Sequence, residues 1–424
     1  MDEHLLSVTV KGDESPATAG AVDTRFFRYL RILTGQITEI EKGAPRAGSF
    51  HMAETVARKG SRRPTKNGAY AKCECAYPAR TFSKSFTKPG SRGTRIAKLS
   101  YPVPKTAKGR RQNAVEFHLC EKIAENIARV VVGKEEAIEF LLIGLLGEGH
   151  VLLEDVPGLG KTLIAKSLAA SIGASFKRVQ FTPDLLPADI TGFTVYNQQS
   201  GQFIFQSGPV MTHILLADEI NRTIPRTQSS LLECMEEGQV TVDGKTYVLP
   251  RPFFVMATQN PIELEGTFPL PEAQLDRFLL RIGLRYPEAE EEIAILERFQ
   301  KEDPFGDLAA VASPKEISDL QLARRAIHVS APVRKYITEI VGATRTSPAL
   351  RLGASPRGSL GLMRAGQARA ALHGREYVLP DDIKFLTVPV LAHRLILKEE
   401  ERLKGATQEG VLADILGRMT VPCG

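Results

Sequence analysis

The first stretch with a regular pattern of apolar and polar residues runs from about residue 114 to residue 146, and its apolar residues recur at helical spacing. This period predicts two helices, over 115–131 and 134–146, separated by Val130-Val-Val-Gly133. Gly147-Glu-Gly149 ends the second helix, and the short apolar run Val151–Leu153 predicts a buried strand. Apolar residues return at helical spacing over 163–170, so the pattern indicates strand, loop and helix in succession.

The middle of the chain alternates between strand and helix patterns. Apolar runs predict strands over 176–181, 214–219 and 253–260, and helices are expected over 183–190 and 227–237. Two hairpins interrupt this order, one over 192–205 around Ser200-Gly201 and one over 240–249 around a type I′ Asp243-Gly244 turn. Strands that alternate with helices favour an α/β fold with a parallel sheet and crossover helices.

Beyond Tyr286 the strand patterns stop and only helical patterns remain. Helices are expected over 288–299, 320–330, 333–344, 359–371 and 381–396, with start signals at Ser355-Pro356 and Pro380-Asp381. We therefore expect an α/β core over 113–285 and a separate α-helical domain over 286–424.

Charge separates the first 112 residues from the rest. They hold 22 Lys and Arg against 9 Asp and Glu, a net charge of +13, whereas the remainder holds 33 against 40, a net charge of −7. From Arg58 to Arg111 the chain is rich in Lys, Arg, Gly, Ser and Pro, with too little apolar surface to offset chain entropy. We expect 1–112 to be a basic, disordered extension. A nucleic-acid tail and an extended reading frame upstream of the true start are the alternatives.

The whole chain of 424 residues, 43% hydrophobic and 25% charged, has the composition of a globular protein. No apolar run is long enough for a membrane span, and no secretory signal is evident. Cys73-Glu-Cys75 has the form of half a metal site, but no second pair completes it. We expect reduced thiols, no such metal site and a cytoplasmic protein.

The loop after the 151–153 strand has the chemistry of a phosphate site. Gly158 and Gly160 allow backbone N–H groups to turn around an anion, Lys161 can reach the β/γ-phosphates, and the Thr162 hydroxyl can hold Mg²⁺. Asp155 stands where the usual pattern has glycine. The strand-loop-helix context favours a nucleotide site over a chance match.

Two acids and an amide follow two of the predicted core strands. Asp218 and Glu219 end the 214–219 strand, and Asn260 ends the 253–260 strand, where ligands gather in a parallel sheet. An acid near phosphate-bound Mg²⁺ can hold the metal, and a second can activate water. The alternatives are an acid pair that opens a turn and an Asn that precedes Pro261.

With these motifs the chain resembles the MoxR family of AAA+ ATPases, in the clade shared with magnesium chelatase motor subunits. The resemblance rests on five motifs in the family's order, with both hairpins, and covers about residues 114–415. The motifs are Gly158-Leu-Gly-Lys-Thr162, Leu215-Leu-Ala-Asp-Glu-Ile-Asn-Arg222, Ala257-Thr-Gln-Asn-Pro261, Pro271-Glu-Ala-Gln-Leu-Asp-Arg-Phe278 and Gly353-Ala-Ser-Pro-Arg357.

The resemblance implies roles for the matching positions. It implies Mg²⁺ bound by Thr162 and Asp218, catalysis by Glu219, and Asn260 as the first sensor. Arg277 resembles an arginine finger that reaches a neighbouring subunit, and Arg357 resembles the second sensor, which closes the helical lid on the nucleotide. Either arginine could instead bridge carboxylates. The implied ATP-binding set is Val132, Gly133, Pro157, Gly158, Leu159, Gly160, Lys161 and Thr162.

The resemblance further implies an ATP-hydrolysing, chaperone-like motor that works as a homo-oligomeric ring, in the form of a hexamer. Its expected clients are partner proteins, often with von Willebrand factor A domains. A magnesium-chelatase-like motor subunit and a nucleic-acid-dependent motor are the alternatives. The acidic core and the lack of a DNA-binding fold favour a protein client.

Overall fold

The structure, a computed structural model, describes residues 111–154, 158–260, 266–300 and 304–422. Contacts divide the chain into Met1–Ser100 and Tyr101–Gly424, and everything below concerns the described part of the second unit. The expectations of a disordered extension, a nucleic-acid tail and a Cys73–Cys75 site fall outside the described residues.

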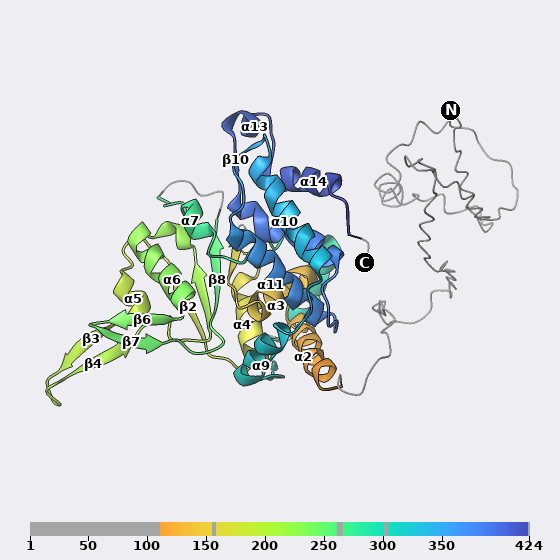
Figure 1. Ribbon diagram of the computed structural model, residues 1–424. Helices are drawn as coiled ribbons and strands as arrows, with labels where there is room; N and C mark the ends of the chain where they lie inside the picture. The colour runs from red at the N-terminus through yellow and green to blue at the C-terminus, as the bar shows by residue number, and fades with distance from the viewer. Residues whose placement is uncertain (1–110, 155–157, 261–265, 301–303, 423–424) are drawn as a thin grey trace, which may run out of the picture. The chain divides into compact units, whose positions relative to one another are not determined.

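A five-stranded parallel sheet forms the centre of the α/β core, in the order β2-β5-β8-β1-β9 (Figure 1). The strands are β1 (Val151–Glu154), β2 (Phe176–Gln180), β5 (Ile214–Asp218), β8 (Phe254–Gln259) and β9 (Leu280–Ile282). The three central strands are almost continuously apolar, as expected for a sheet covered on both faces. The predicted α/β fold is confirmed.

Alternate residues of the central strands pack into two separate cores. Val151, Leu153 and Leu216 face one side with the helices α2, α3 and α4 and with the C-terminal helices. Leu152 and Leu215 face the other side with α6. The helices of the α/β core are α2 (Arg111–Ala128), α3 (Glu135–Leu146), α4 (Lys161–Ser171), α5 (Pro187–Thr191), η1 (Ile220–Arg222), α6 (Pro225–Glu237) and α7 (Glu272–Leu275).

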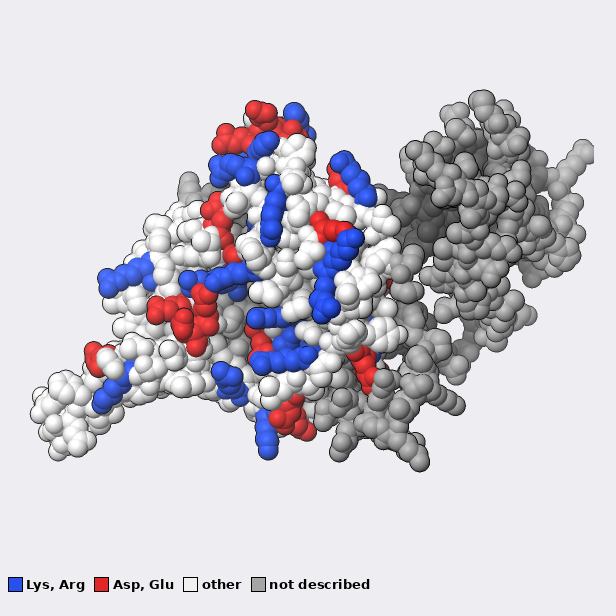
Figure 2. Space-filling view, in the orientation of Figure 1, with Lys and Arg blue, Asp and Glu red and all other residues white. Residues whose placement is uncertain are grey.

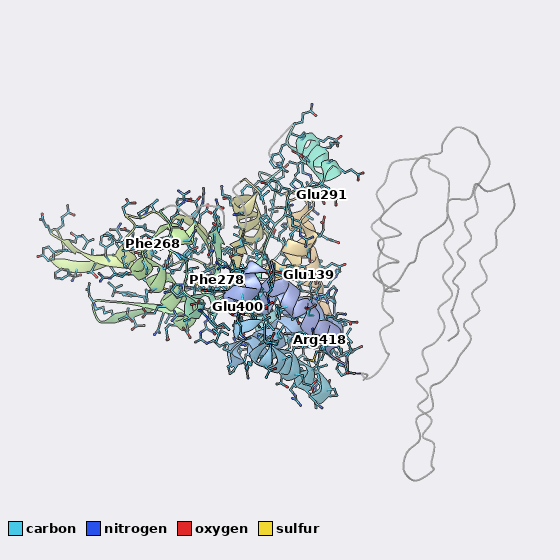
Figure 3. The ribbon with its side chains drawn as sticks, turned by 90° about the horizontal axis from the view of Figure 1, so that it is seen from above. Glu139, Phe268, Phe278, Glu291, Glu400 and Arg418 are labelled. Atoms are coloured by element: carbon cyan, nitrogen blue, oxygen red, sulfur yellow. The ribbon has the colours of Figure 1, made fainter. Side chains whose placement is uncertain are left out.

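Two β-hairpins extend from the core on the side away from the C-terminal helices (Figures 1 and 3). They are β3 (Gly192–Asn197) with β4 (Gln202–Ser207), and β6 (Gln239–Val242) with β7 (Lys245–Val248). Positive φ angles at Gly201, Asp243 and Gly244 agree with the predicted turns. Phe205 stacks on Tyr247 with ring centroids 4.0 Å apart, so the two hairpins support each other.

The C-terminal part is a helical domain that packs against the β9 side of the sheet (Figure 1). Its helices are α8 (Ala289–Phe299), α9 (Pro314–Arg324), α10 (Ala331–Thr346), α11 (Pro356–Leu372), α12 (Pro380–Leu391), η2 (Ala392–Arg394), α13 (Glu399–Leu403) and α14 (Gln408–Arg418). Ser355 caps α11 as expected, accepting a hydrogen bond from the Arg357 N–H.

Several predicted elements were wrong in extent or kind. Helix α9 begins at Pro314, not at residue 320, because Ser313 and Glu316 form a capping box. Helix α5 begins four residues later than predicted, at Pro187, whose fixed φ suits a first helical position. Strands do not stop after Tyr286, since β10 (Leu350–Leu352) pairs with β11 (Ile396–Leu397), and the helix expected to reach residue 396 ends at Leu391.

Candidate active site

The loop after β1 enters α4 through two glycines in left-handed backbone conformations. Gly158 and Gly160 have φ angles of +89° and +81°, which glycine adopts at low cost. A Cβ atom at either position would meet nothing within 4 Å, so open space adjoins the loop. Gly160 precedes Lys161 and Thr162, the first residues of α4, and provides no side-chain cap for the N–H groups of that turn. This arrangement fits a bound polyphosphate. Leu159 packs against the core and anchors the loop, while Pro157 lies outside the described residues.

Asp218 and Glu219 lie at the same edge of the sheet. Asp218 is the last residue of β5, and Glu219 follows with φ 57° and ψ 49°. Because β1, β5 and β8 are parallel, their carboxyl ends share the edge that carries the phosphate loop. The Asp218 side chain is 15% exposed and accepts a hydrogen bond from Arg178 at 2.6 Å. With the Thr162 hydroxyl it offers the oxygen ligands that Mg²⁺ prefers, so the residues present fit that ion.

Thr258 connects the two acids. It lies near the end of β8 and is only 1% exposed. Its hydroxyl donates to Asp218 Oδ1 at 2.5 Å and accepts from the Glu219 N–H at 2.8 Å. One hydroxyl therefore orients the Asp218 carboxylate and holds the left-handed backbone at Glu219.

Polar groups from neighbouring elements hold the Glu219 carboxylate. Gln180, the last residue of β2, donates to Glu219 Oε2 at 2.5 Å, and Arg222 Nε lies 3.0 Å from the same oxygen. Asn260 comes directly after β8 and is 8% exposed. The structure thus brings Asp218, Glu219 and Asn260 to the edge that carries the phosphate loop.

The segment expected to contact adenine lies at the start of α3. Gly133 has a φ angle of +68°, and a Cβ atom there would meet the Glu291 carboxylate of α8 at 2.3 Å. Lys134 donates to the Arg285 carbonyl, beyond the carboxyl end of β9, at 2.7 Å. Val132 and Gly133 are therefore close to the sheet edge of the phosphate loop, and their role stays a prediction.

Arg277 lies at the opposite edge of the sheet. It comes three residues before β9, and Val151 of β1 pairs with Leu280 of that strand. The Leu279 N–H donates to the carbonyl of His150, the residue before β1. At about 3.3 Å per residue, the four residues of β1 separate this edge from the phosphate loop by on the order of 13 Å.

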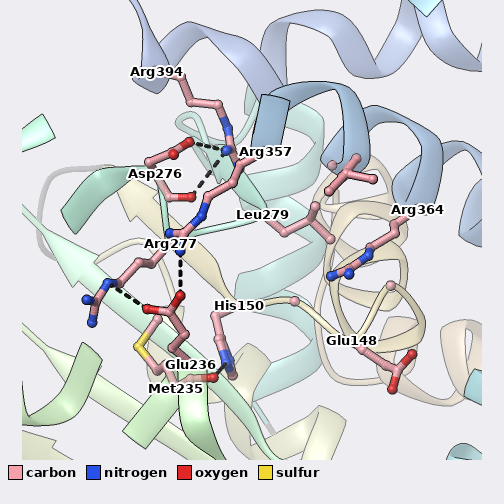
Figure 4. Close-up of a pocket in the computed structure, with 14 residues that line it drawn as sticks. Glu148, His150, Met235, Glu236, Asp276, Arg277, Leu279, Arg357, Arg364 and Arg394 are labelled. Carbon is pink, nitrogen blue, oxygen red and sulfur yellow. Dashed lines mark hydrogen bonds and ion pairs between the residues drawn. The ribbon is translucent and has the colours of Figure 1, made fainter. Parts of the chain in front are cut away.

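Arg357 lies beside Arg277. It is the second residue of α11, and its Nη2 is 2.5 Å from Oε1 of Glu236, while Arg277 Nε is 3.2 Å from Oε2 of the same carboxylate (Figure 4). At the C-terminal end of α11, Arg369 pairs with Glu139 of α3 at 2.9 Å. Helix α11 therefore runs opposite to α3, and its N-terminus lies where β1 begins. Arg357 thus lies at the end of β1 away from the phosphate loop of its own chain, and its role as the second sensor stays a prediction.

The helical domain also holds the chain on both sides of Arg277. Arg394, 4% exposed, forms an ion pair with Asp276 and donates to the Phe278 carbonyl at 2.6 Å. Burial lowers the pKa of Arg394, and the Asp276 carboxylate opposes this shift. The Ser355 hydroxyl donates to the other Asp276 oxygen at 3.1 Å.

His150 is a neutral, structural group beside this junction. Its Nδ1 accepts from the Val255 N–H at 3.0 Å, so Nε2 is the donor to the Met235 carbonyl at 3.1 Å. Burial lowers the pKa of His150 to about 4. The ring joins the end of α6, which carries Glu236, to the start of β1.

Gln180, Thr258 and Glu236 were not among the predicted site residues. Gln180 and Thr258 could have been found as polar side chains near the ends of strands that neighbour the Asp218 strand. Glu236 gave no such signal, because its sequence neighbours form an ordinary helix. Glu236 is recognisable as a site residue only in the structure, where Arg277 and Arg357 both contact its carboxylate.

The described residues contain no group of three or more His, Cys, Asp and Glu side chains placed to hold a metal ion. Among the helices of the described part, none is long and apolar enough to cross a membrane.

Two stretches of the chain match known protein families. Residues 150–280 match the ATPase family associated with various cellular activities (AAA). Residues 342–415 match the AAA lid domain.

Similar proteins cover roughly three quarters of this chain. An uncharacterized Bacillus subtilis protein, YeaC, is 51% identical over 72% of this chain and 95% of its own length. The chaperone MoxR1 of Mycobacterium tuberculosis is 41% identical over 73% of this chain and 84% of its own. A crystal structure of a candidate ATPase from Cytophaga hutchinsonii superposes with a TM-score of 0.70, at 39% identity, over 74% of this chain and 98% of that one.

Proposed function

Because the chain belongs to the MoxR family of AAA+ ATPases and hydrolyses ATP, we propose that its active sites are shared between the subunits of a ring. One subunit supplies the phosphate loop, the acids and Asn260. Its neighbour supplies Arg277 and Arg357. The domains that do this work are the core over 113–285 and the lid over 286–424.

The observation that carries the proposal is the division of the site residues between two opposite edges of one sheet. Lys161 and Glu219 lie at the carboxyl edge, and Arg277 and Arg357 share Glu236 at the amino edge. A guanidinium helps phosphoryl transfer only where it touches the developing charge. In a closed ring, the amino edge of one subunit can face the carboxyl edge of the next.

The residues of the carboxyl edge then have distinct tasks. Lys161 and the loop N–H groups bind the phosphates, Glu219 takes a proton from the attacking water, and Asn260 orients that water. Thr162 and Asp218 would hold Mg²⁺, which offsets phosphate charge when bound. Val132 and Gly133 contact adenine, and Pro157 and Leu159 complete the proposed ATP-binding set. Glu219→Gln should therefore bind ATP and hydrolyse it poorly, whereas Lys161→Ala should lose binding.

The test mixes inactive variants. Arg277→Ala and Arg357→Ala should bind ATP nearly normally and hydrolyse it slowly, because the missing charge matters most in the transition state. Mixing either with Glu219→Gln should restore part of the activity, since an intact Glu219 can then face an intact arginine. Arg351→Ala, at an exposed arginine of the lid, is the matched control and should stay active alone. No recovery in mixed rings that demonstrably form would mean that each site is complete within one chain.

We further propose that ATP turnover drives the remodelling of partner proteins in the cytoplasm, with von Willebrand factor A domain proteins as candidate clients. The name of the chaperone MoxR1 supports this role. The buried free thiols of Cys120 and Cys234 agree with a reducing compartment.

The β3–β4 hairpin is our candidate for the client contact. From residue 190 to residue 217 the chain contains no Asp, Glu, Lys or Arg, and the projecting hairpin is free of charge in Figure 2. Phe203, 73% exposed, and Tyr196, 53% exposed, lie on it with their rings 5.2 Å apart. Lys and Arg supply most of the affinity for a phosphate backbone, so this uncharged surface favours a polypeptide over a nucleic acid. A candidate client should raise the ATPase rate, and DNA, the control, should leave it unchanged.

A further inference from the structure

Glu236 neutralises two arginines that the proposed function assigns to another subunit's nucleotide. Its carboxylate, at the end of α6, receives Arg277 on one oxygen at 3.2 Å and Arg357 on the other at 2.5 Å (Figure 4). These three side chains are between 31% and 50% exposed. The contact therefore joins core and lid at a place that a neighbouring molecule can reach.

The cavity around this contact, about 330 Å³ in volume, is positively charged. Four arginines line it, Arg277, Arg357, Arg364 and Arg394. The only other charged side chains in the lining are acidic, Glu148, Glu236 and Asp276, so cations exceed anions by one.

The lining acids are not equally available to the two arginines. Glu148 is engaged by Arg324, the last residue of α9, and by Arg325, which follows that helix, and Asp276 is engaged by Arg394. Glu236 is thus the lining acid that pairs with both Arg277 and Arg357. Two guanidinium groups that share one carboxylate can accept a more highly charged anion in its place.

We propose that Glu236 is the resting counter-ion of Arg277 and Arg357, and that the γ-phosphate of the neighbouring subunit's ATP displaces it when the ring assembles. This inference rests on the proposed function. Carboxylate and phosphate oxygens compete for the same guanidinium N–H donors, so the arginines cannot satisfy both fully. The exposure of all three groups keeps the Glu236 contact weak enough to exchange.

Glu236 acts in the free subunit rather than in the assembled ring. Assembly must first break two contacts with Glu236, so this residue opposes the joining of subunits. It also keeps two like charges from repelling each other before a nucleotide arrives. Removing its charge should favour assembly and leave the chemistry of the closed ring unchanged.

The experiment follows ATP hydrolysis per subunit across a dilution series of the full chain. Glu236→Gln keeps the side-chain shape and removes the charge. It should lower the subunit concentration at half-maximal activity by roughly three- to ten-fold, in keeping with weak exposed pairs. At saturating concentration kcat should stay within about two-fold of the wild type. Glu237→Gln, at the next, exposed residue of α6, is the matched control and should shift neither value.

A chain without the two arginines distinguishes displacement of Glu236 by phosphate from a purely structural effect of the Glu236→Gln substitution. In a chain that carries Arg277→Ala and Arg357→Ala, Glu236→Gln has no contact to release. ATP-dependent assembly, measured by sedimentation, should then be the same with and without it. A shift of equal size in both backgrounds would overturn the proposal, since coupled residues show non-additive effects.

Two other results for Glu236→Gln would also refute the proposal. An unchanged or raised half-maximal concentration for Glu236→Gln would refute the exchange, as would a large loss of kcat at saturation. Failure of the proposed function looks different. In that case mixing Arg277→Ala or Arg357→Ala with Glu219→Gln would recover no activity in mixed rings that demonstrably form, whatever Glu236→Gln does.

Discussion

Thr258→Val removes a hydroxyl that both acids of the carboxyl edge use, and it nearly preserves side-chain volume. In the wild type this hydroxyl donates to Asp218 at 2.5 Å and accepts from the Glu219 N–H at 2.8 Å. Asp218 keeps Arg178 as a partner in the variant. The Glu219 N–H loses the acceptor that holds its backbone in the left-handed region.

The expected loss can be worked from these contacts. A hydrogen bond to a carboxylate contributes about 1.5–3 kcal/mol, and a buried N–H without an acceptor costs about 1–3 kcal/mol. The left-handed backbone of Glu219 adds strain of order 1 kcal/mol, which the strand end relieves when the anchor is lost. If about 2 kcal/mol of the total falls on the transition state, kcat decreases about 30-fold.

The assay measures kcat and KM for ATP. Urea unfolding measures how much of the lost interaction free energy destabilises the folded protein instead of the transition state. KM should change less than about three-fold, because the phosphate loop is untouched. Thr258→Ser keeps the hydroxyl and should restore most of the rate. Thr241→Val, which removes an exposed hydroxyl pair with Thr246 on the second hairpin, should leave kcat unchanged. A Thr258→Val protein with wild-type kcat would show that Thr258 does not position Glu219.

Three further predictions concern stability and domain organisation. Glu148→Gln should destabilise the protein by about 2–4 kcal/mol in urea unfolding, because Arg324, only 3% exposed, loses its counter-ion; Lys335→Gln, at an exposed pair with Glu339, should cost under about 0.5 kcal/mol, and equal effects would contradict the burial argument. The pKa of His150 is about 4 in the folded protein against an ordinary 6.5, so the unfolded chain binds the proton first as pH falls. Stability should decline from pH 6.5 to 4 by at most about 3 kcal/mol from this group, and His150→Gln should flatten the decline measured by urea unfolding at several pH values. Deleting residues 1–110 should leave basal ATPase activity intact, and a truncated protein that cannot bind nucleotide would refute that expectation.

Local patterns were sufficient to predict the elements that carry the nucleotide site. The strands β1, β5 and β8 are short apolar runs bounded by turn residues, and both hairpin turns contain residues that adopt positive φ. The phosphate loop and the acids follow directly from these strands. Chemistry and secondary structure lie in the same short segments, so the sequence predicts both together.

Elements defined by distant partners were missed or misplaced. Strand β9 has three residues, and β1 pairs with it from more than a hundred residues away in sequence. In the apolar run Phe278-Leu-Leu280 nothing distinguishes such a strand from a buried loop. The β10–β11 pair is equally short and joins segments on either side of α11 and α12. Tertiary pairing, not propensity, determines these elements.

The placement of the two arginines depends on the position of the lid, and the sequence could not predict that position. The residues on either side of Arg277 are bonded to Arg394 of the lid, and Arg357 belongs to the lid itself. A rotation of the helical domain relative to the sheet must therefore carry both arginines together, or break the Arg394 contacts with Asp276 and Phe278. Arg394 is almost completely buried, so breaking those contacts would leave an uncompensated charge in the interior, at a cost of about 3–5 kcal/mol. The lower-energy motion keeps the arginines with the lid, and a phosphate that binds them thereby acts on the lid as a whole.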